Sequence, residues 1–244
     1  TESVWKLLLQ YAIPSVIAMT ASSLYNITDS IFIGQGVGAL AISGLAISFP
    51  LMNLSAAFGT LVGAGAANLI SLRLGQKDYT SANKILGNVV SLTTILGVSY
   101  TLGILFFLDP ILIFFGASSD TLPFAKEYML IITLGNVVTH MYFGLNALMR
   151  SSGFPAKSMY ATIASVLINA VLTPIFIYGL DMGIRGAAVA TVLSQIILLT
   201  WQVKFFSDKS NFLHFKREHL KIDSKIVKDT MSIGLAPFLM NAVS

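Results

Sequence analysis

The stretch KLLLQYAIPSVIAMTASSLYNITDSIFIGQ, residues Lys6–Gln35, decides the fold class. It is an apolar run of about thirty residues, longer than the ~20 that a helix needs to cross a bilayer. Near its start lies Pro14, and near its end lies one acid, Asp29. A carboxylate inside a membrane-spanning helix costs roughly 2.5–3.5 kcal/mol on insertion scales, so it normally faces protein or trapped water and has a function. We therefore expect Asp29 to lie in an internal polar site.

Composition indicates an integral membrane protein built from helices. Hydrophobic residues make up 55% of the 244 residues and charged residues only 11%. The basic residues lie between apolar spans, where they are typical of a topology signal, and we expect no nucleic-acid partner. The absence of cysteine excludes disulfides and thiolate metal sites, and the three histidines show no ligand spacing.

Six apolar spans are long enough to cross a membrane: 6–34, 40–70, 85–108, 124–149, 157–180 and 186–206. A seventh begins near Ile226, and the sequence ends inside it. We therefore expect a piece of a longer protein, with a six-helix lobe at 1–206, a linker at 207–225 and the start of a second lobe at 226–244. The expected fold class is an all-α integral membrane protein, a six-helix transmembrane bundle.

The distribution of lysine and arginine predicts the orientation in the membrane. Of the 15 basic residues, 13 precede the first span or follow the second, fourth and sixth, and only Lys126 and Arg185 fall on the other side. Because basic residues concentrate in cytoplasmic loops, we expect a cytoplasmic N-terminus. The loop Ser207–Lys228 is then cytoplasmic, and its mixed charges predict a solvated linker.

The turn RSSGFP begins at Arg150, at the end of the fourth span. Glycine and proline punctuate it as a short turn between helices. We expect Arg150 to bond the last carbonyls of its helix or a lipid phosphate, with a gate contact as the alternative.

Polar residues inside the spans form a candidate site. Asn26 and Asp29 are three residues apart, Asn169 and Thr173 are four apart, and Thr191 lies one turn into the sixth span. Because the spans alternate in direction, Asp29, Thr173 and Thr191 should lie at one depth in the outer leaflet, about five to seven residues from the helix ends.

Carboxylate, amide and hydroxyl oxygens are suitable ligands for sodium, and a desolvated carboxylate could instead carry a proton. Asp29 and Asn169 are the expected Na⁺ ligands. Taken singly, Asn169 and the threonines are also explained by hydrogen bonds between helices. We interpret Asn136 and His140 as bundle polar residues rather than ligands, and name them with Asn26 as candidates to line a cavity.

The sequence resembles the multidrug and toxin extrusion (MATE) transporters. The resemblance rests on YNITDSIFIGQ from Tyr25, NALMRSSGFP from Asn146, NAVLTPIFI from Asn169 and GIRGAAVAT from Gly183, in the order and spacing of the family. It implies twelve helices in two six-helix lobes around a central cavity. It also implies an antiporter that admits sodium or a proton as organic cations leave.

The resemblance also implies a cation site in the first lobe at Asp29, Asn169, Thr173 and Thr191. Thr173 stands where the family commonly has an aspartate, so one formal charge is missing. A single carboxylate should hold sodium more weakly than two, or operate by protonation alone, and both coupling ions remain open.

Pro14 has no N–H to donate, and its ring clashes with the carbonyl of Gln10. We therefore expect a bend or weak point of the first helix there. Aligning Pro14 with Pro237 suggests a repeat with an offset of 223 residues. Doubling this offset gives a parent of roughly 450 residues, with the substrate at the interface between lobes.

Two alternatives belong to other classes. A lipid-linked saccharide flippase should line its cavity with several basic residues, whereas none lies deep in these spans. A membrane scaffold without transport activity would need no buried acid. No catalytic constellation is present, so we expect no enzyme and no cofactor. The expected partners are organic cations, membrane lipid and the second lobe, in a bacterial-type plasma membrane crossed several times.

Overall fold

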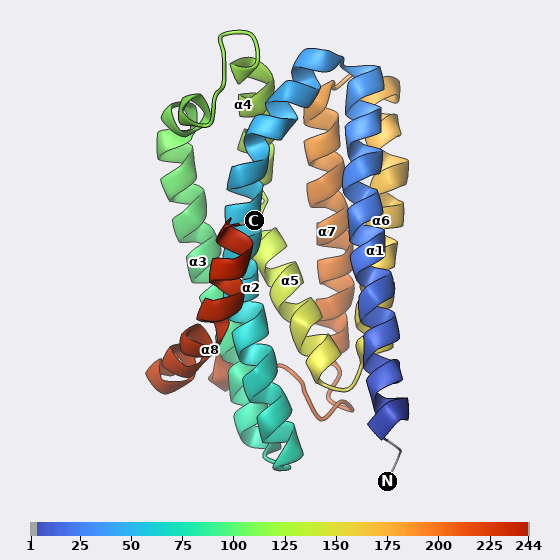
Figure 1. Cartoon of the computed structure of the whole chain (residues 1–244). Coiled ribbons are helices and arrows are strands. Elements are labelled where there is room, and N and C mark those ends of the chain that lie inside the picture. The colour runs from blue at the N-terminus through green and yellow to red at the C-terminus, as the bar shows by residue number, and fades with distance from the viewer. Residues whose placement is uncertain (1–3, 244) are drawn as a thin grey trace.

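The computed structural model describes residues 4–243, which are almost entirely helical (Figure 1). The membrane-sized helices are α1 (Val4–Gly36), α2 (Ala39–Gly75), α3 (Tyr79–Phe114), the pair α4 (Leu122–Leu134) and α5 (Asn136–Ser151), α6 (Pro155–Pro174) and α7 (Ile184–Ser207). Three further elements are the π-helix η1 (Ile175–Gly179), the 3₁₀-helix η2 (Arg217–Leu220) and helix α8 (Ser224–Val243).

Within the described residues, five helices are long and apolar enough to cross a membrane, and the bent pair α4–α5 makes a sixth candidate. Large apolar side chains cover the outside of the bundle, among them Phe106, Phe114 and Leu167, which are 84%, 83% and 61% exposed. Such a surface suits a lipid environment, where every backbone group is satisfied inside a helix. The predicted fold class, an all-α membrane bundle, is confirmed.

The helices run up and down, so alternate connections lie at the same end (Figure 1). One end holds the start of α1, the α2–α3 and α5–α6 turns and the linker after α7. We call it the basic end, because 13 of the 15 lysines and arginines belong to it. The other two are ion-paired: Lys126 with Asp109 and Arg185 with Glu127, both at 2.7 Å.

Helices α2 and α3 extend beyond their apolar spans and form a hairpin at the basic end (Figure 1). Asp78 caps α3 by accepting a hydrogen bond from the backbone N–H of Ser81 at 3.0 Å. The hydrogen bonds from Ser81 lower the pKa of the Asp78 carboxyl below its ordinary value.

The fourth predicted span, 124–149, is not one straight helix. It consists of α4 and α5, which are bent by 56° at Gly135. Val192 of α7 lies so close that a Cβ on Gly135 would stand 2.5 Å from its Cγ2. Across the break, the hydroxyl of Thr101 in α3 donates to the backbone O of Thr133 at 2.8 Å. A side chain thus satisfies a carbonyl next to the interruption, as a membrane interior requires.

Two large hydrophobic clusters, one near each end, and a smaller third one hold the described part of the bundle together. The cluster away from the basic end joins α1, α2, α3, α4 and α7 through residues such as Leu45 and Ile184. The cluster at the basic end joins α2, α3, α5 and α7 through residues such as Leu86. The third joins α5, α6 and α7 through Tyr142 and Leu198.

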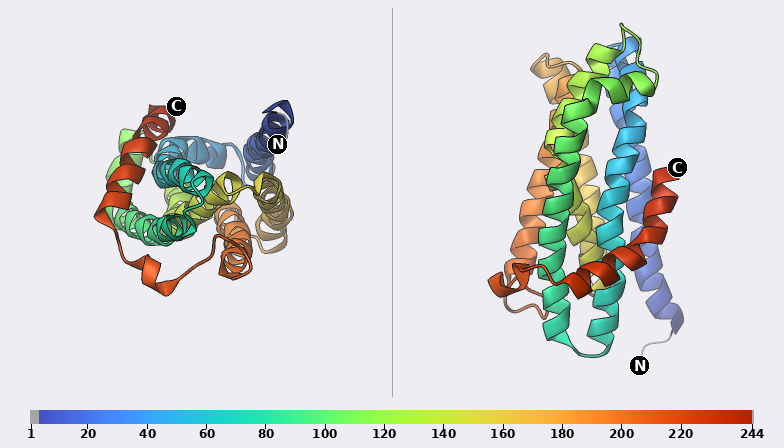
Figure 2. Two further views of the ribbon diagram at one scale, coloured as in Figure 1. Left: turned by 90° about the horizontal axis from the view of Figure 1, so that it is seen from below. Right: turned by 90° about the vertical axis from the view of Figure 1, so that its left-hand side faces the viewer.

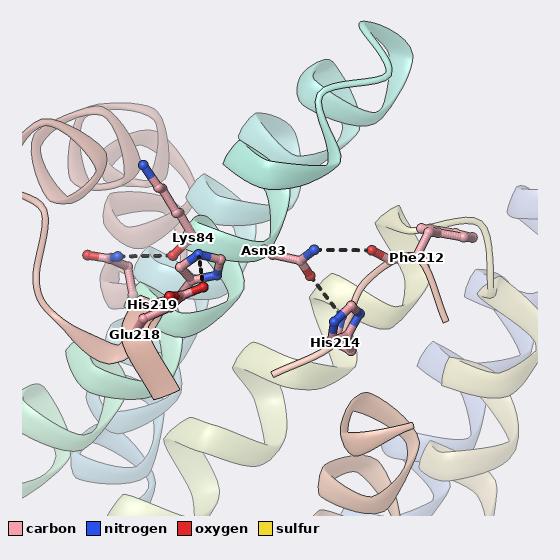
Figure 3. Close-up of polar contacts among 7 residues, drawn as sticks. Asn83, Lys84, Phe212, His214, Glu218 and His219 are labelled. Carbon is pink, nitrogen blue, oxygen red and sulfur yellow. Dashed lines mark hydrogen bonds and ion pairs between the residues drawn. The ribbon is translucent and has the colours of Figure 1, made fainter. Parts of the chain in front are cut away.

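The linker after α7 is held to the lobe by hydrogen bonds from α3, although most of its side chains, such as those of Lys209 and Lys216, are exposed, as expected of a solvated linker (Figure 3). Asn83 of α3 donates to the backbone O of Phe212 at 3.3 Å and accepts from the N–H of His214 at 2.8 Å. Asn88 binds the backbone of Lys221 and Asp223 in the same two-sided way. Leu213, an apolar residue of the linker, is only 1% exposed. The amide side chains of α3 replace water for this part of the chain, which the charge pattern did not show.

Helix α8 starts from the linker, crosses the bundle and then turns upward beside α2 (Figure 2). The two helices touch through their backbones: a Cβ on Gly65 would clash with the backbone O of Thr230, and one on Gly234 would clash with that of Leu61. The part of α2 around Gly65 is thus a packing surface for α8.

Candidate cation site and adjoining cavity

Helix α1 packs mainly along α6 (Figure 1), and this contact buries Asp29. The carboxyl side chain faces Thr173, one residue before Pro174, which cannot donate a helical hydrogen bond. The π-helix η1 begins directly after that proline. Asp29, Asn169 and Thr173 are 4%, 2% and 0% exposed.

The structure brings all four predicted site residues together. The hydroxyl of Thr173 lies 3.2 Å from Oδ1 of Asp29 and 3.4 Å from Oδ1 of Asn169. Asn169 donates through Nδ2 to the hydroxyl of Thr191 at 3.3 Å. Three helices, α1, α6 and α7, therefore contribute oxygen atoms at one level. The sequence predicted this grouping from depth, from helix spacing and from the resemblance, and the hydrogen bonds show the contact.

The single hydroxyl proton of Thr173 cannot serve both neighbours at once. A charged acceptor forms the stronger hydrogen bond, so ionised Asp29 takes the proton. The side-chain oxygen of Asn169 then keeps its lone pairs free. The site offers a carboxylate, an amide oxygen and a hydroxyl oxygen without another acid among these four residues.

These oxygen positions fit a hard cation. The spacings of 3.2 and 3.4 Å match neighbouring ligands around an ion with metal–oxygen distances of about 2.3–2.6 Å, since adjacent octahedral ligands lie about 1.4 times that distance apart. Asp29, Asn169, Thr173 and Thr191 are the residues that would hold it.

Tyr25, which the sequence analysis missed, connects this group to the bundle interior. Its hydroxyl lies 2.7 Å from the hydroxyl of Thr191. Thr191 gives its own proton to the backbone O of Ala187 at 3.1 Å, so Tyr25 is the donor. The signal was present in the spacing, because Tyr25 precedes Asp29 by four residues and lies about 40° from it around the helix.

A cavity of about 610 Å³ lies between α1, α2, α5, α6 and α7. Tyr25 and Thr191 line it, whereas Asp29, Asn169 and Thr173 do not. A series of polar contacts through Thr191, Asn169 and Thr173 therefore leads from the cavity wall to the buried carboxylate. The wall is mostly neutral, with aromatic rings such as Phe49 and Phe143 beside amides and hydroxyls.

Two of the three residues named as cavity candidates line this cavity. Asn26 and Asn136 do so, but His140 does not and is only 1% exposed. Asn26 is also separate from Asp29, since the exposed Asn26 side chain faces the cavity while Asp29 turns towards α6. Three residues along a helix correspond to about 60°, which is enough to direct the two side chains differently.

His140 is hydrogen-bonded behind the cavity wall. Ser55 of α2 donates to Oδ1 of Asn136 at 2.6 Å and lies 3.0 Å from Nε2 of His140. Because Ser55 has one hydroxyl proton, the imidazole donates through Nε2 in this arrangement. This agrees with the interpretation of Asn136 and His140 as bundle polar residues.

Arg150 lines the cavity at the end of α5. Neither a hydrogen bond to the last carbonyls of its helix nor an ion pair is found for its guanidinium within residues 4–243. The expectation of a helix-end contact is therefore not met. The turn after α5 brings α6 back beside it, which leaves the side chain at the cavity margin.

Helix α1 continues without interruption through Pro14. The expected bend is therefore not a break in the helix in this conformation. The hydroxyl of Ser15 bonds the backbone O of Tyr11 at 2.8 Å, so the neighbouring turn retains a side-chain contact.

Comparison with known proteins agrees with this architecture. The family model described as MatE matches residues 14–175, which is more than half of the chain. The chain belongs to the MatE family. The predicted resemblance is thereby confirmed.

Relatives of this MatE chain include the multidrug export protein MepA of Staphylococcus haemolyticus, which is 31% identical over 239 residues. The match covers 98% of this chain and 53% of MepA. A solved outward-facing conformation of a multidrug resistance MATE family transporter of the MOP superfamily is similar with a TM-score of 0.89 and 27% identity, covering 96% of this chain and 52% of that one.

A crystal structure of MATE in the bent conformation also has a TM-score of 0.89, with 27% identity over 95% of this MatE chain and 52% of its own. The chain thus spans about half the length of the relatives that it matches. These relatives are named as transporters, and none of these names describes an enzyme.

Proposed function

We propose that this lobe, together with a second lobe, forms an antiporter that exports small organic molecules in exchange for a cation. The observation that carries the proposal is the buried Asp29 carboxylate, joined by polar contacts through Thr173, Asn169 and Thr191 to the wall of a cavity of about 610 Å³. A buried acid without a paired base is costly unless it binds an ion or proton.

The coupling ion, Na⁺ or H⁺, is proposed to act at the same four residues. Sodium would be held by the oxygens of Asp29, Asn169, Thr173 and Thr191. The Thr173 hydroxyl would then no longer donate a hydrogen bond to Asp29. A proton on Asp29 would instead make the carboxyl a donor. In both cases the hydrogen bond between Asp29 and Thr173 changes, and no cofactor is required.

Coupling to the cavity follows from Thr191 and Tyr25. If Thr191 turns its oxygen towards a bound cation, the hydrogen bond from Tyr25 at 2.7 Å must lengthen or redirect. Tyr25 lines the cavity, so the shape of the wall changes with ion occupancy. A ligand that binds one of the two wall shapes more tightly then also changes the affinity of the site for the ion, because coupling between two binding sites is reciprocal.

We place the transporter in a bacterial plasma membrane, with the N-terminus and the basic end in the cytoplasm. Support comes from the concentration of 13 of 15 basic residues at that end. Lys209→Cys, at an exposed linker position, should resist an impermeant thiol reagent added outside intact cells and react after permeabilisation. Labelling of intact cells would mean that the basic end faces the outside of the cell.

A lipid-linked saccharide flippase remains the alternative. Phosphate binding favours several arginines or lysines, whereas Arg150 is the single basic residue among those that line the cavity within residues 4–243. The cavity composition therefore favours a drug or metabolite of low charge over a lipid diphosphate.

The decisive experiment is transport by the full-length protein in proteoliposomes, with sodium and pH gradients imposed separately. An inward gradient of the coupling ion should drive a fluorescent substrate outward, and Asp29→Asn should abolish the dependence on that gradient. Transport that ignores both gradients, or survives Asp29→Asn with its coupling intact, would remove the basis for the proposal.

A further inference from the structure

The end of the linker and the first turn of α8, residues 220–228, lie against the side of α3, and we call this segment the strap. Ser91 of α3 donates to the backbone O of Leu220 at 2.6 Å, and Asn88 bonds the backbone of the strap through both ends of its amide. Both α3 residues belong to the apolar span 85–108, and Ser91 lies about 9 Å along that span from its start. The strap is therefore held beside a membrane-spanning helix rather than beyond its end.

The strap exposes apolar side chains at this level. Leu220 and Ile222 are 41% and 48% exposed. Figure 2 shows the linker passing around the outside of the bundle, and the first part of α8 running across the bundle rather than along it. Apolar side chains on a segment that lies along a membrane surface are stabilised by contact with the acyl chains below the headgroups.

Three lysines accompany these apolar side chains: Lys221, Lys225 and Lys228. All three are exposed, and within residues 4–243 their ammonium groups form neither an ion pair nor a hydrogen bond. Asp223, the one acid among these nine residues of the sequence, accepts from the backbone N–H of Lys225 at 2.9 Å and so caps α8. The three positive charges are therefore available to an anion from outside the lobe.

The first turn of α8 separates this charge from the bundle. Ile226 and Val227 pack against the hydrophobic cluster at the basic end. Lys225 and Lys228 are three residues apart and share the opposite face of the helix. Packing on one side and the amides of α3 on the other hold the backbone in place. The lysine stems can then lie along acyl chains while the ammonium groups reach the phosphate level.

We propose that the strap binds the phosphate groups of anionic phospholipids in the leaflet at the basic end of the bundle. Its three lysines contact the headgroups, and Leu220 and Ile222 enter the acyl region beneath them. Lysines next to a membrane-spanning helix attract anionic lipid, and a strap with a fixed backbone makes that attraction local. This binding is separate from the proposed export, because no strap residue lines the cavity.

The test uses the full-length protein in vesicles of phosphatidylcholine with a minor fraction of phosphatidylglycerol. Ser224→Cys, at an exposed strap position, carries an environment-sensitive fluorophore in a background without other cysteines. A nitroxide quencher is attached to the acyl chain of one lipid or the other, at equal mole fraction. We expect both lipids to quench, and labelled phosphatidylglycerol to quench about threefold more strongly. The same fluorophore at Thr80→Cys, an exposed position before the apolar span of α3, should be quenched little by either.

The three strap lysines are tested together, as Lys221→Gln, Lys225→Gln and Lys228→Gln. The triple substitution should abolish the preference for phosphatidylglycerol and leave quenching by phosphatidylcholine in place, because the apolar contacts remain. If this variant does not fold, salt gives the same test on the protein that carries only the reporter. Salt screens exposed charges, so the preference should fall as the concentration rises from about 50 to 500 mM.

A matched control removes as much charge from exposed lysines outside the strap. Lys204→Gln, Lys209→Gln and Lys216→Gln together should leave the preference at the Ser224 position unchanged. Equal losses in the two triple variants would assign the preference to the net charge of the protein and would overturn the strap site.

Equal quenching by the two lipids in the protein that carries only the reporter overturns the proposal, and so does a preference that persists without the strap lysines or in high salt. If neither lipid quenches the fluorophore at Ser224→Cys, the second lobe or water covers the strap, and the proposal is wrong. None of these outcomes bears on export, which gradient-driven transport measures separately.

Discussion

In the proposed cation site, Thr173 is the position at which a second carboxylate would strengthen cation binding, and its hydroxyl is 3.2 Å from Oδ1 of Asp29. The position is fully buried, so a side chain placed there cannot turn to solvent. Its identity therefore sets how much negative charge the site offers to a cation. Thr173 and Asp29 are the two residues at which the choice between sodium and proton is most directly tested.

Thr173→Asp should raise sodium affinity at least tenfold at high pH, because a second anion close to the ion adds Coulomb attraction. In the empty site the two carboxylates cannot both ionise cheaply, so the variant should also take up one proton as pH falls. Sodium binding to the purified full-length protein, measured with isotope, checks both effects. Thr173→Ser is the control, since it keeps the hydroxyl. An unchanged affinity between about pH 6 and pH 9 in a folded variant would place Thr173 outside the site.

Tyr25→Phe should separate ion binding from transport. The change removes the hydroxyl that lies 2.7 Å from Thr191 but leaves the four proposed ligands in place. We expect sodium or proton binding within about twofold of wild type and a loss of most gradient-driven export. Tyr178→Phe is the matched control, because its hydroxyl also bonds α1, at the backbone O of Phe32 3.3 Å away, but outside this chain of contacts. Equal effects of the two substitutions would leave Tyr25 without a coupling role.

Helix positions and the candidate site could be predicted largely from the sequence, because apolar length and helix direction determine both. Asp29, Thr173 and Thr191 were grouped by depth, Asn169 was added by its spacing from Thr173 and by the resemblance, and the structure joins them. The sequence did not indicate that the Tyr25 hydroxyl meets Thr191. Sequence spacing indicates which face a side chain occupies but not which partner it meets.

The break between α4 and α5 could not be predicted, because Gly135 alone does not bend a helix and its backbone angles, φ −79° and ψ −6°, are open to any residue. At the break Gly135 lies against Val192, which is 57 positions away in the sequence, and a sequence pattern does not show such a contact. Apolar length alone predicted one span.

Gly135→Ala should destabilise the folded protein by about 1–3 kcal/mol, because its Cβ would stand 2.5 Å from Cγ2 of Val192. The double variant Gly135→Ala/Val192→Ala should recover part of that loss, which identifies the contact by its non-additivity. Thermal unfolding of detergent-solubilised protein measures both. Gly103→Ala is the control, since a Cβ there meets nothing within 4 Å. Additive effects of the two changes would show that Val192 does not determine the geometry at the break.

At the scale of the whole molecule, the linker after α7 behaves as part of the lobe. The charge pattern predicted a solvated linker. Composition does not show which backbone groups of the linker form hydrogen bonds with another helix. Asn83 and Asn88 bind it through both ends of their amides, and Ser91 donates to the backbone O of Leu220 at 2.6 Å.

Asn83→Ala together with Asn88→Ala should release the linker and speed trypsin cleavage at Lys209, Lys216 and Lys221 at least tenfold, because cleavage requires local unfolding. Limited digestion followed by mass spectrometry locates the cuts. Asn53→Ala, which changes an asparagine of the cavity wall instead, is the matched control. Cleavage at the wild-type rate would mean that the apolar contacts of Leu213 hold the linker without the asparagines.

The backbone contact between α2 and α8 bears on how smoothly the two lobes could move. Gly65 meets the carbonyl of Thr230, and Gly234 meets that of Leu61, so no layer of side chains separates the helices there. Flexible side chains allow packed helices to slide by small steps, whereas two glycines set against carbonyls fit in one register. Displacement by one residue in either direction would drive a Cβ into the opposite backbone. Sliding α8 along α2 would therefore press one backbone against the other, so the two helices would have to separate before either could shift.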